Sequence, residues 1–354
     1  MIALSAADAR RLAVRAQLLD ADRPAGMLEV VHRLAGVQHD PTAAVAPSAD
    51  LVLWSRLGAE YSPRDLRDAL DEQRLLELGS MVYPAGDLAL YQAEMAVWPG
   101  RPPLTEGQED LRDWVDANDG CRRDILSLLR RDGPLTVREL PDTCVVPWRS
   151  SGWTNDRNVR KLVDLMVDRG EVAAAGRRGP ERLWDLADRI YPDDPLPYDE
   201  AMRLRAERRL RALGIVRPRA GELPVGEPAT VEGVRGRWRV DPALLDAPFT
   251  GRTALLSPLD RLVFDRKRLT DLFGYDYQLE MYKPAATRRW GYWAMPILCG
   301  DRLVGKLDAT SDRRAGLFRV QAVHEDEPFT PAMTAAVQDE IGALASWLGL
   351  ERGA

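Results

Sequence analysis

The chain has 354 residues, of which 45% are hydrophobic and 29% charged, and its formal net charge is −6. This length suits two or three modules with buried cores, and the composition is that of an ordinary globular protein. The acidic balance excludes a surface that is basic throughout, although a local basic face could still bind nucleic acid. The sequence contains neither a long apolar span nor a signal peptide, so we expect a cytoplasmic protein without membrane contact.

Cysteine and histidine are too sparse for the common metal and disulfide frameworks. Three widely separated cysteines form no Cys-x-x-Cys pair, which argues against a zinc knuckle and suits a reducing compartment. The histidines are also far apart, without a His-Glu-x-x-His run, and no P-loop or Gly-x-Ser-x-Gly elbow occurs. We therefore expect no metal site and no cofactor. The residues concerned are Cys121, Cys144, Cys299, His32, His39 and His324.

Residues 1–118 read as a first module. Apolar periodicity predicts helices over 5–19 and roughly 25–35, and the second helix stops at Gly36. An extended segment over 37–40 is ended by a proline, and Ser62-Pro63 begins a further helix. This order is consistent with a winged-helix-like module.

Residues 119–191 give the clearest prediction, a central winged helix. Its two main helices are followed by a hairpin with two arginines at its tip. Thr136 and Glu139 are spaced as a capping box. The predicted elements are helices over 121–131 and 155–169, and a hairpin over 171–186 with its turn at 176–180.

Residues 192–354 are assigned to a third winged-helix-like module and a β-rich C-terminal region. A proline-rich linker at 192–197 precedes an arginine-rich helix over 200–213, and 222–241 alternate like a small sheet. From Ser257 onward we expect apolar and aromatic strands alternating with turns, among them Gly300-Asp301. Thr330-Pro331 begins a last helix that ends near Trp347.

Gln38 and Asp40 are the candidate catalytic pair. In an extended segment, residues two apart point to the same side, so an amide and a carboxylate could face one ligand. His39 would point to the opposite side, where we expect a packed histidine. Taken without further context, the pair instead caps the turn before Pro41, and this alternative stays open.

Several runs resemble the AlkZ/YcaQ family of bacterial DNA glycosylases. The N-terminal match consists of Gln38-x-Asp40 and Leu53-Trp54-Ser55-Arg56-Leu57. The C-terminal match is denser and comprises Leu255 to Leu262, Asp265 to Arg268, Leu272 to Tyr277, Leu279 to Tyr282, Gly291 to Trp293 and Gly300 to Asp308. The resemblance implies an α+β fold in which tandem winged-helix modules form a concave DNA channel, with a β-rich C-terminal region.

The resemblance also assigns a branch within that family. AlkZ-like members carry Gln-x-Gln and YcaQ-like members carry Gln-x-Asp, so Gln38 and Asp40 resemble the second type. The chain departs from that type at His39, where the middle residue is usually apolar. It departs again at Pro47, Ala49 and Asp50, where YcaQ-like sequences tend to carry arginine and histidine. These departures keep an inactive paralogue open as an alternative.

The implied function is a monofunctional DNA glycosylase of base excision repair. It would hydrolyse the N-glycosidic bond of alkylated purines in duplex DNA, such as N7-alkylguanine, with bulky or interstrand-crosslinked adducts as further candidates. Asp40 would activate water or stabilise the cationic sugar, and Gln38 would position the water. The first lysine is Lys161, so no Schiff-base nucleophile lies near the motif in sequence.

Basic residues in four runs are candidates for contact with DNA phosphates. Each could equally be part of a solvated helix face. The main rival function is a non-catalytic winged-helix DNA-binding protein, and no obligate protein partner is inferred. The candidates are Arg157, Arg160 and Lys161 on the predicted recognition helix, Arg177 and Arg178 on the wing, Arg205, Arg208 and Arg209 on the arginine-rich helix, and Arg288 and Arg289 in a run resembling a hairpin that could probe a groove.

Overall fold

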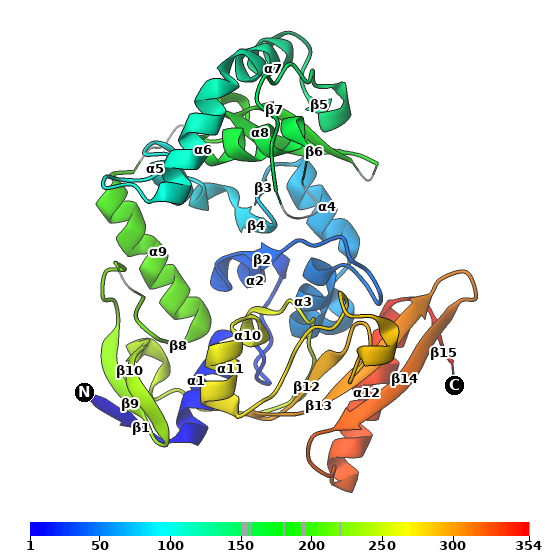
Figure 1. Cartoon of the computed structure of the whole chain (residues 1–354). Coiled ribbons are helices and arrows are strands. Elements are labelled where there is room, and N and C mark those ends of the chain that lie inside the picture. The colour runs from blue at the N-terminus through cyan, green and yellow to red at the C-terminus, as the bar shows by residue number, and fades with distance from the viewer. Residues whose placement is uncertain (151–154, 156, 180, 193–195, 220, 354) are drawn as a thin grey trace. The chain divides into compact units, whose positions relative to one another are not determined.

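The computed structural model describes residues 1–150, 155, 157–179, 181–192, 196–219 and 221–353. The chain folds into two compact units (Figure 1). Unit 1 comprises Met1–Leu66 together with Ala206–Ala354, and unit 2 comprises Arg67–Arg205. The predicted division at 1–118, 119–191 and 192–354 describes modules along the sequence and stays a prediction.

The N-terminal strand of the chain joins a four-stranded sheet of unit 1 with the order β1-β9-β10-β8, whose other strands lie within residues 215–240 (Figure 1). The first strand, β1 (Ile2–Leu4), pairs in parallel with β9 (Glu227–Val231). The remaining strands, β10 (Val234–Val240) and β8 (Ile215–Val216), are antiparallel neighbours. The strands β9 and β10 confirm the small sheet predicted within 222–241, whereas β1 was not predicted.

A five-stranded sheet forms the C-terminal part of unit 1, with strands in the order β11 to β15. Its central strands are antiparallel, and the predicted turn Gly300-Asp301 joins β12 to β13. Thr330 caps the last helix, α12, through its side chain, and this helix ends at Trp347 as predicted. The elements are β11 (Thr253–Leu255), β12 (Met295–Cys299), β13 (Arg302–Asp312), β14 (Leu317–Glu325), α12 (Pro331–Trp347) and β15 (Glu351–Gly353).

The region between β11 and β12 corrects the sequence-based expectation of strands. It contains the helices α10 (Arg261–Phe264) and α11 (Arg266–Phe273) and a 3-10 turn, η6 (Ala285–Thr287). The side chains of Asp260 and Asp265 accept hydrogen bonds from backbone N–H groups in the first turns of α10 and α11. These N-caps explain why the apolar residues of this region are helical.

The candidate catalytic pair lies between helices α2 and α3 in the N-terminal part of unit 1. Ser5 caps α1, and the second helix is followed by a two-residue strand that ends at Gln38. Helix α4 carries the chain into unit 2, and α9 (Tyr198–Leu213) returns it to unit 1. The elements are α1 (Ala6–Ala16), α2 (Met27–Arg33), β2 (Val37–Gln38), α3 (Ser48–Leu57), η1 (Gly58–Glu60) and α4 (Pro63–Asp71).

Unit 2 contains the predicted central module. Strands β6 and β7 form the predicted hairpin, and β5 pairs with β7, which gives the sheet order β5-β7-β6. Thr136 and Glu139 form the predicted capping box, although the helix that they cap is a single 3-10 turn. The winged-helix assignment of this order stays a prediction. The elements are α7 (Asp119–Asp132), β5 (Leu135–Thr136), η3 (Val137–Glu139), α8 (Asn158–Asp168), β6 (Val172–Arg178) and β7 (Glu181–Leu186).

The rest of unit 2 includes an antiparallel hairpin that was not predicted, formed by β3 (Leu75–Leu78) and β4 (Met81–Pro84). Helices α5 (Ala89–Met95) and α6 (Glu106–Ala117) follow it. Two predicted features fall partly outside the described residues, namely the wing tip at Pro180 and the linker at 193–195. Among the helices that the structure describes, none is long and apolar enough to cross a membrane.

Candidate active site and DNA-contact residues

The chain reverses direction immediately before the candidate pair. After α2, Ala35 and Gly36 adopt positive φ angles of 51° and 96°, and the following Val37 is 1% exposed. Left-handed backbone is unusual for alanine, so this turn needs support from its surroundings. Arg261 supplies it, because its Nη1 donates to the carbonyl oxygens of Leu34 and Ala35, both at 2.9 Å.

Ser48 fixes the backbone of Gln38 and Asp40 to the start of α3. Its hydroxyl donates to the Gln38 carbonyl oxygen at 2.7 Å and accepts from the Asp40 N–H at 3.0 Å. Its own N–H donates to the Asp40 carbonyl oxygen at 3.3 Å. Ser48 is fully buried, so these bonds are shielded from water. The backbone that carries the candidate pair is therefore anchored on both sides of His39.

The two candidate side chains are half-buried and differ in what holds them. The Asp40 Oδ1 atom accepts from the Thr42 N–H at 2.8 Å, which is the turn bond that the structural alternative requires. Within the part of the chain that the structure describes, no hydrogen bond to Asp40 Oδ2 or to the Gln38 amide is present. The carboxylate is thus oriented through one oxygen while the other is available to a ligand.

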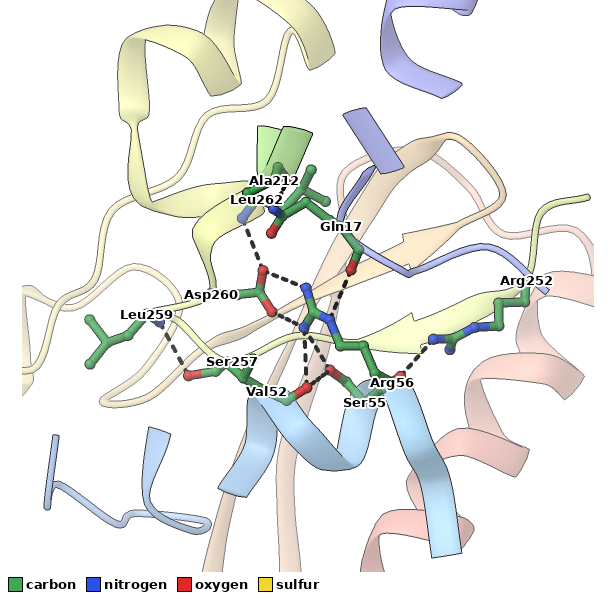
Figure 2. Close-up of polar contacts among 10 residues, drawn as sticks. All are labelled: Gln17, Val52, Ser55, Arg56, Ala212, Arg252, Ser257, Leu259, Asp260 and Leu262. Carbon is green, nitrogen blue, oxygen red and sulfur yellow. Dashed lines mark hydrogen bonds and ion pairs between the residues drawn. The ribbon is translucent and has the colours of Figure 1, made fainter. Parts of the chain in front are cut away.

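A fully buried ion pair joins Arg56, on the helix α3 that begins at Ser48, to Asp260, the neighbour of Arg261 (Figure 2). The Arg56 Nη2 atom donates to Asp260 Oδ1 at 3.1 Å, and Nη1 contacts Oδ2. Arg56 Nε donates to the Gln17 carbonyl oxygen at 3.0 Å, and Asp260 Oδ1 also accepts from the Leu262 N–H. Because both charges are paired and hydrogen-bonded, burial does not leave either one uncompensated.

Two further arginines bind the carboxyl end of α3. Arg252 Nη2 donates to the Ser55 carbonyl oxygen at 2.6 Å, and Arg23 Nη1 donates to the Arg56 carbonyl oxygen at 2.9 Å (Figure 2 shows the first). Carbonyl groups in the last turn of a helix have no partner within that helix. The helix dipole also favours a positive charge at this end. Burial and the nearby Arg23 lower the pKa of Arg252 to about 10, so its guanidinium stays charged at neutral pH.

The departures from the YcaQ-like pattern at Pro47, Ala49 and Asp50 lie at the start of α3. Pro47 precedes the first residue of the helix, and Ala49 is fully buried. Asp50 Oδ1 accepts from the Tyr61 hydroxyl at 2.6 Å. In this chain Ala49 therefore packs in the protein core, and Asp50 forms a hydrogen bond with Tyr61.

Three lysines belong to the same unit as Gln38 and Asp40, although they lie far from that pair in the sequence. Each of them is ion-paired. Lys267 contacts Asp271 at 3.1 Å, Lys283 contacts Glu280 at 2.8 Å and Lys306 contacts Asp326 at 2.6 Å.

Comparison with known proteins assigns the chain to a family. The model of the AlkZ-like DNA glycosylases, described as "DNA glycosylase AlkZ-like", matches residues 31–223 and 219–347. The chain belongs to this family. Membership confirms the predicted family and the predicted class of enzyme, a DNA glycosylase, whereas assignment to the Gln-x-Asp branch stays a prediction.

A solved member of this family shares the fold. The structure of the Streptomyces sahachiroi DNA glycosylase AlkZ superposes with a TM-score of 0.62 at 16% sequence identity, covering 99% of this chain and 98% of that one. The match confirms the predicted α+β fold class. At this identity it is evidence for the fold alone.

The DNA-contact candidates of this AlkZ-like chain separate into two groups, of which the first makes no ion pair among the residues that the structure describes. Arg157 and Arg160, on or just before α8, are exposed and make no ion pair with residues that the structure describes. Lys161 Nζ lies 4.8 Å from the centre of the Trp148 ring. Arg288 lies over Tyr292 at 5.0 Å and donates to the Lys283 carbonyl oxygen.

The second group is already neutralised within the molecule. On the wing, Arg177 pairs with Glu77 and Arg178 with Glu139, both at 2.9 Å. Hydrogen bonds from the Thr136 N–H, Arg178 and the Thr136 hydroxyl lower the pKa of Glu139 to about 2.

The arginines of α9 are also engaged. Arg205 pairs with Glu94 and lies over the Tyr91 ring at 4.5 Å. Arg209 pairs with Glu222 at 2.9 Å, and its side chain is only 15% exposed. Arg208, on the same helix, also has interactions with its neighbours.

The run around Arg288 and Arg289 corrects the prediction of a hairpin. It forms the 3-10 turn η6 inside a long loop. The buried Glu280 carboxylate accepts from the N–H groups of Arg289 and Trp290, at 2.7 and 2.8 Å. These donors are therefore not available for a strand ladder. Arg289 also pairs with Asp276 at 3.1 Å.

Proposed function

We propose that this chain is a monofunctional DNA glycosylase that hydrolyses the N-glycosidic bond of alkylated purines in duplex DNA. The observation that carries the proposal is the anchoring of Asp40. Ser48 binds its backbone on both sides, and Thr42 binds one carboxylate oxygen, so the second oxygen has a defined direction. A carboxylate of this kind suits a reaction in which positive charge develops on a sugar.

In this proposal, Asp40 and Gln38 have different roles in hydrolysis. Departure of the base leaves positive charge on the deoxyribose, and the Asp40 carboxylate stabilises that charge or removes a proton from the attacking water. The Gln38 amide, two residues earlier in the same extended segment, orients the water or the sugar. Both side chains are half-buried, which leaves them accessible to a substrate.

Alkylated purines fit because their chemistry reduces what the protein must supply. A purine alkylated at N7 or N3 carries a positive charge before the bond breaks, so it leaves as a neutral base without prior protonation. A second carboxylic acid is then unnecessary. Bulky N7 adducts and interstrand crosslinks share this cationic leaving group and are further candidate substrates.

The absence of a lyase step follows from the surroundings of the lysines. A lysine must lose its proton before it can form a Schiff base with the abasic sugar. An adjacent carboxylate favours the protonated ammonium form. Lys267 and Lys283 have such a partner in Asp271 and Glu280. Lys306 pairs with Asp326, but burial still lowers its pKa. For this lysine the reason is instead that its side chain is only 1% exposed and out of reach of an abasic sugar. We expect no borohydride-trapped DNA adduct, and detection of one would contradict the monofunctional assignment.

For binding of duplex DNA, we propose Arg157, Arg160, Lys161 and Arg288 as the principal phosphate contacts. Arg177, Arg178, Arg205, Arg208, Arg209 and Arg289 remain secondary candidates. The reason is that phosphate must first displace an acidic partner from Arg177, Arg178, Arg205, Arg209 and Arg289, and Arg208 is engaged with neighbouring groups.

The test is release of free base from duplex DNA that contains one N7-methylguanine. We expect wild-type protein to release it and Asp40→Asn to be at least about 100-fold slower, with DNA affinity within about twofold. Asp22→Asn is the matched control, because Asp22 is an exposed aspartate of the same unit. Equal rates for wild type and Asp40→Asn would reject the role of Asp40.

The remaining outcomes separate the alternatives. Lesion-dependent binding without release of N7-methylguanine or of a bulky N7 adduct would identify an inactive paralogue. Sequence-specific binding to undamaged DNA would instead identify a non-catalytic DNA-binding protein.

A further inference from the structure

Unit 2 brings together two of the three cysteines and a carboxylate that the sequence does not present as a motif. The Sγ atoms of Cys121 and Cys144 and a carboxylate oxygen of Asp142 all lie within 4.8 Å of one another. Cys121 comes from α7 and is 1% exposed, Cys144 is half-buried and Asp142 is exposed. The cluster therefore has a buried thiol at its base and an opening toward solvent.

The loop that carries Asp142 and Cys144 is held by two asparagines. The Oδ1 atom of Asn118, which is 1% exposed, accepts from the N–H groups of Val145 and Val146 at 2.9 and 3.0 Å. Asn158 accepts from the Trp148 N–H at 2.7 Å and donates to Asp142 at 3.2 Å. Because these bonds do not involve sulfur, the loop is shaped independently of any bond between the thiols.

Further hydrogen bonds hold the loop that carries Asp142 and Cys144 beside Cys121. The Asp142 Oδ1 atom accepts from the Cys144 N–H at 3.3 Å, which closes a short turn between the two. The Cys121 thiol donates to the Pro141 carbonyl oxygen at 3.6 Å. Thr143 lies between Asp142 and Cys144, and its hydroxyl donates to Asp124 on α7 at 2.7 Å. The loop is thus fastened to the helix that supplies Cys121.

We propose that Cys121, Asp142 and Cys144 bind a thiolate-preferring divalent cation of the zinc type. Two thiolates and one carboxylate are ordinary zinc ligands, and water can complete a tetrahedron on the exposed side. Zinc–sulfur bonds of about 2.3 Å place two thiolates about 3.8 Å apart, so closure needs side-chain shifts of about 1 Å at most. This site is independent of the glycosidic chemistry proposed above.

Metal binding would act on the candidate DNA-contact surface of unit 2. The loop ends at Trp148, which packs edge-on against Trp114 at 5.2 Å and lies beneath Lys161. Asn158, which binds the same loop, is the first residue of α8. A cation that joins the loop to α7 would therefore stabilise the approach to the helix that carries Arg160 and Lys161.

The test uses the purified, reduced full-length chain after treatment with a chelator, titrated with Co²⁺. We expect one equivalent to bind and to produce thiolate-to-cobalt charge-transfer absorption, which Zn²⁺ then removes. Cys144→Ser should abolish this absorption, and Asp142→Asn should weaken Co²⁺ binding at least about tenfold. Cys299→Ser is the control, because Cys299 belongs to unit 1 and should leave the absorption unchanged.

Cys121→Ser alters a core residue and could impair folding, so Cys144→Ser is the decisive variant. The proposal is overturned if the reduced protein gives no charge-transfer absorption, or if Cys144→Ser binds Co²⁺ like wild type. It is also overturned if the reduced protein takes up no metal while peroxide treatment yields a Cys121–Cys144 disulfide. None of these readouts depends on glycosylase activity, so failure here leaves the proposed function untouched.

Discussion

Asp40 and Arg178 are both charged side chains to which the sequence assigns a function, but their surroundings differ. Asp40 belongs to a segment that the buried Ser48 holds in place, Arg261 binds the turn before that segment, and one Asp40 oxygen stays available. Arg178 lies on an exposed hairpin, and Glu139 already neutralises its charge. The candidate segment is thus positioned by hydrogen bonds to its backbone, whereas a wing arginine would have to leave an acidic partner before it could bind DNA.

This difference shows why counting basic residues overestimates the charge available to DNA. The chain has 49 basic and 55 acidic residues, and five of the ten predicted phosphate contacts pair with one of those acids. The other five are Arg157, Arg160, Lys161, Arg208 and Arg288, of which Arg208 interacts with its neighbours. Four predictions test the contrast.

The largest expected effect comes from breaking the buried ion pair between Arg56 and Asp260. Asp260→Asn leaves the Arg56 guanidinium buried without its counter-ion, and we expect a loss of about 3–5 kcal/mol in the free energy of unfolding. Urea unfolding measures it. The control is Glu327→Gln, which removes an exposed pair with Arg302 and should cost at most about 1 kcal/mol. Equal destabilisation by both variants would show that burial of the pair is unimportant.

Arg261 offers a finer test, because it acts through the turn that precedes Gln38. In Arg261→Lys, a single ammonium replaces the guanidinium that now binds the carbonyls of Leu34 and Ala35. We expect kcat for base release to fall roughly tenfold with KM little changed, because the reacting groups are misplaced while DNA binding persists. Arg302→Lys is the exposed control. A rise in KM at constant kcat would instead place Arg261 in substrate binding.

The sequence predicts those elements whose signals are local. Ser5, Thr330 and the pair Thr136 and Glu139 cap helical turns at the predicted positions, and the hairpin over 171–186 forms as expected. The helices α10 and α11 were missed because their aromatic and apolar residues resemble strands, while the capping aspartates carry the better signal. Strand β1 was missed because it is only three residues long and its partner β9 lies more than 220 residues away in the sequence.

The candidate site shows the same limit. Gln38 and Asp40 were found because they lie two residues apart and match a family motif. Ser48, Arg56 and Arg261 act on backbone atoms or on a distant carboxylate, and nothing in their local sequence indicates that. The ion pairs of the wing arginines could not be predicted for a related reason, because Glu77 and Glu139 come from other elements.

The third prediction compares the two groups of basic residues directly. Arg157→Gln combined with Arg160→Gln should lower the slope of log affinity against log salt by about 1.8, since each phosphate contact contributes about 0.9. The matched variant, Arg178→Gln combined with Arg289→Gln, should change the slope by less, because both arginines begin in ion pairs. Fluorescence anisotropy at several salt concentrations measures both slopes. A larger change for the second variant would reverse the ranking proposed here.

The smallest effect concerns Glu139, which holds Arg178 on the wing. Glu139→Gln keeps a side chain that can complete the capping box but removes the charge that pairs with Arg178. Because the folded-state pKa of Glu139 is lowered to about 2, its carboxylate stabilises the folded protein fully above the ordinary value of 4.5. This contribution is lost as the pH falls from there toward 2. The thermal stabilities of wild type and variant should therefore differ at neutral pH and converge in acid.

The same variant should bind DNA slightly more tightly, because Arg178 no longer has to leave an acidic partner before it meets a phosphate. The gain should fall as salt rises, and Arg178→Gln should remove it. If Glu139→Gln instead weakened DNA binding, the ion pair would be orienting the wing for DNA. Acidic residues such as Glu139 would then help to position the arginines for DNA. An intramolecular ion pair would no longer indicate that an arginine has a structural role and not a DNA-binding one.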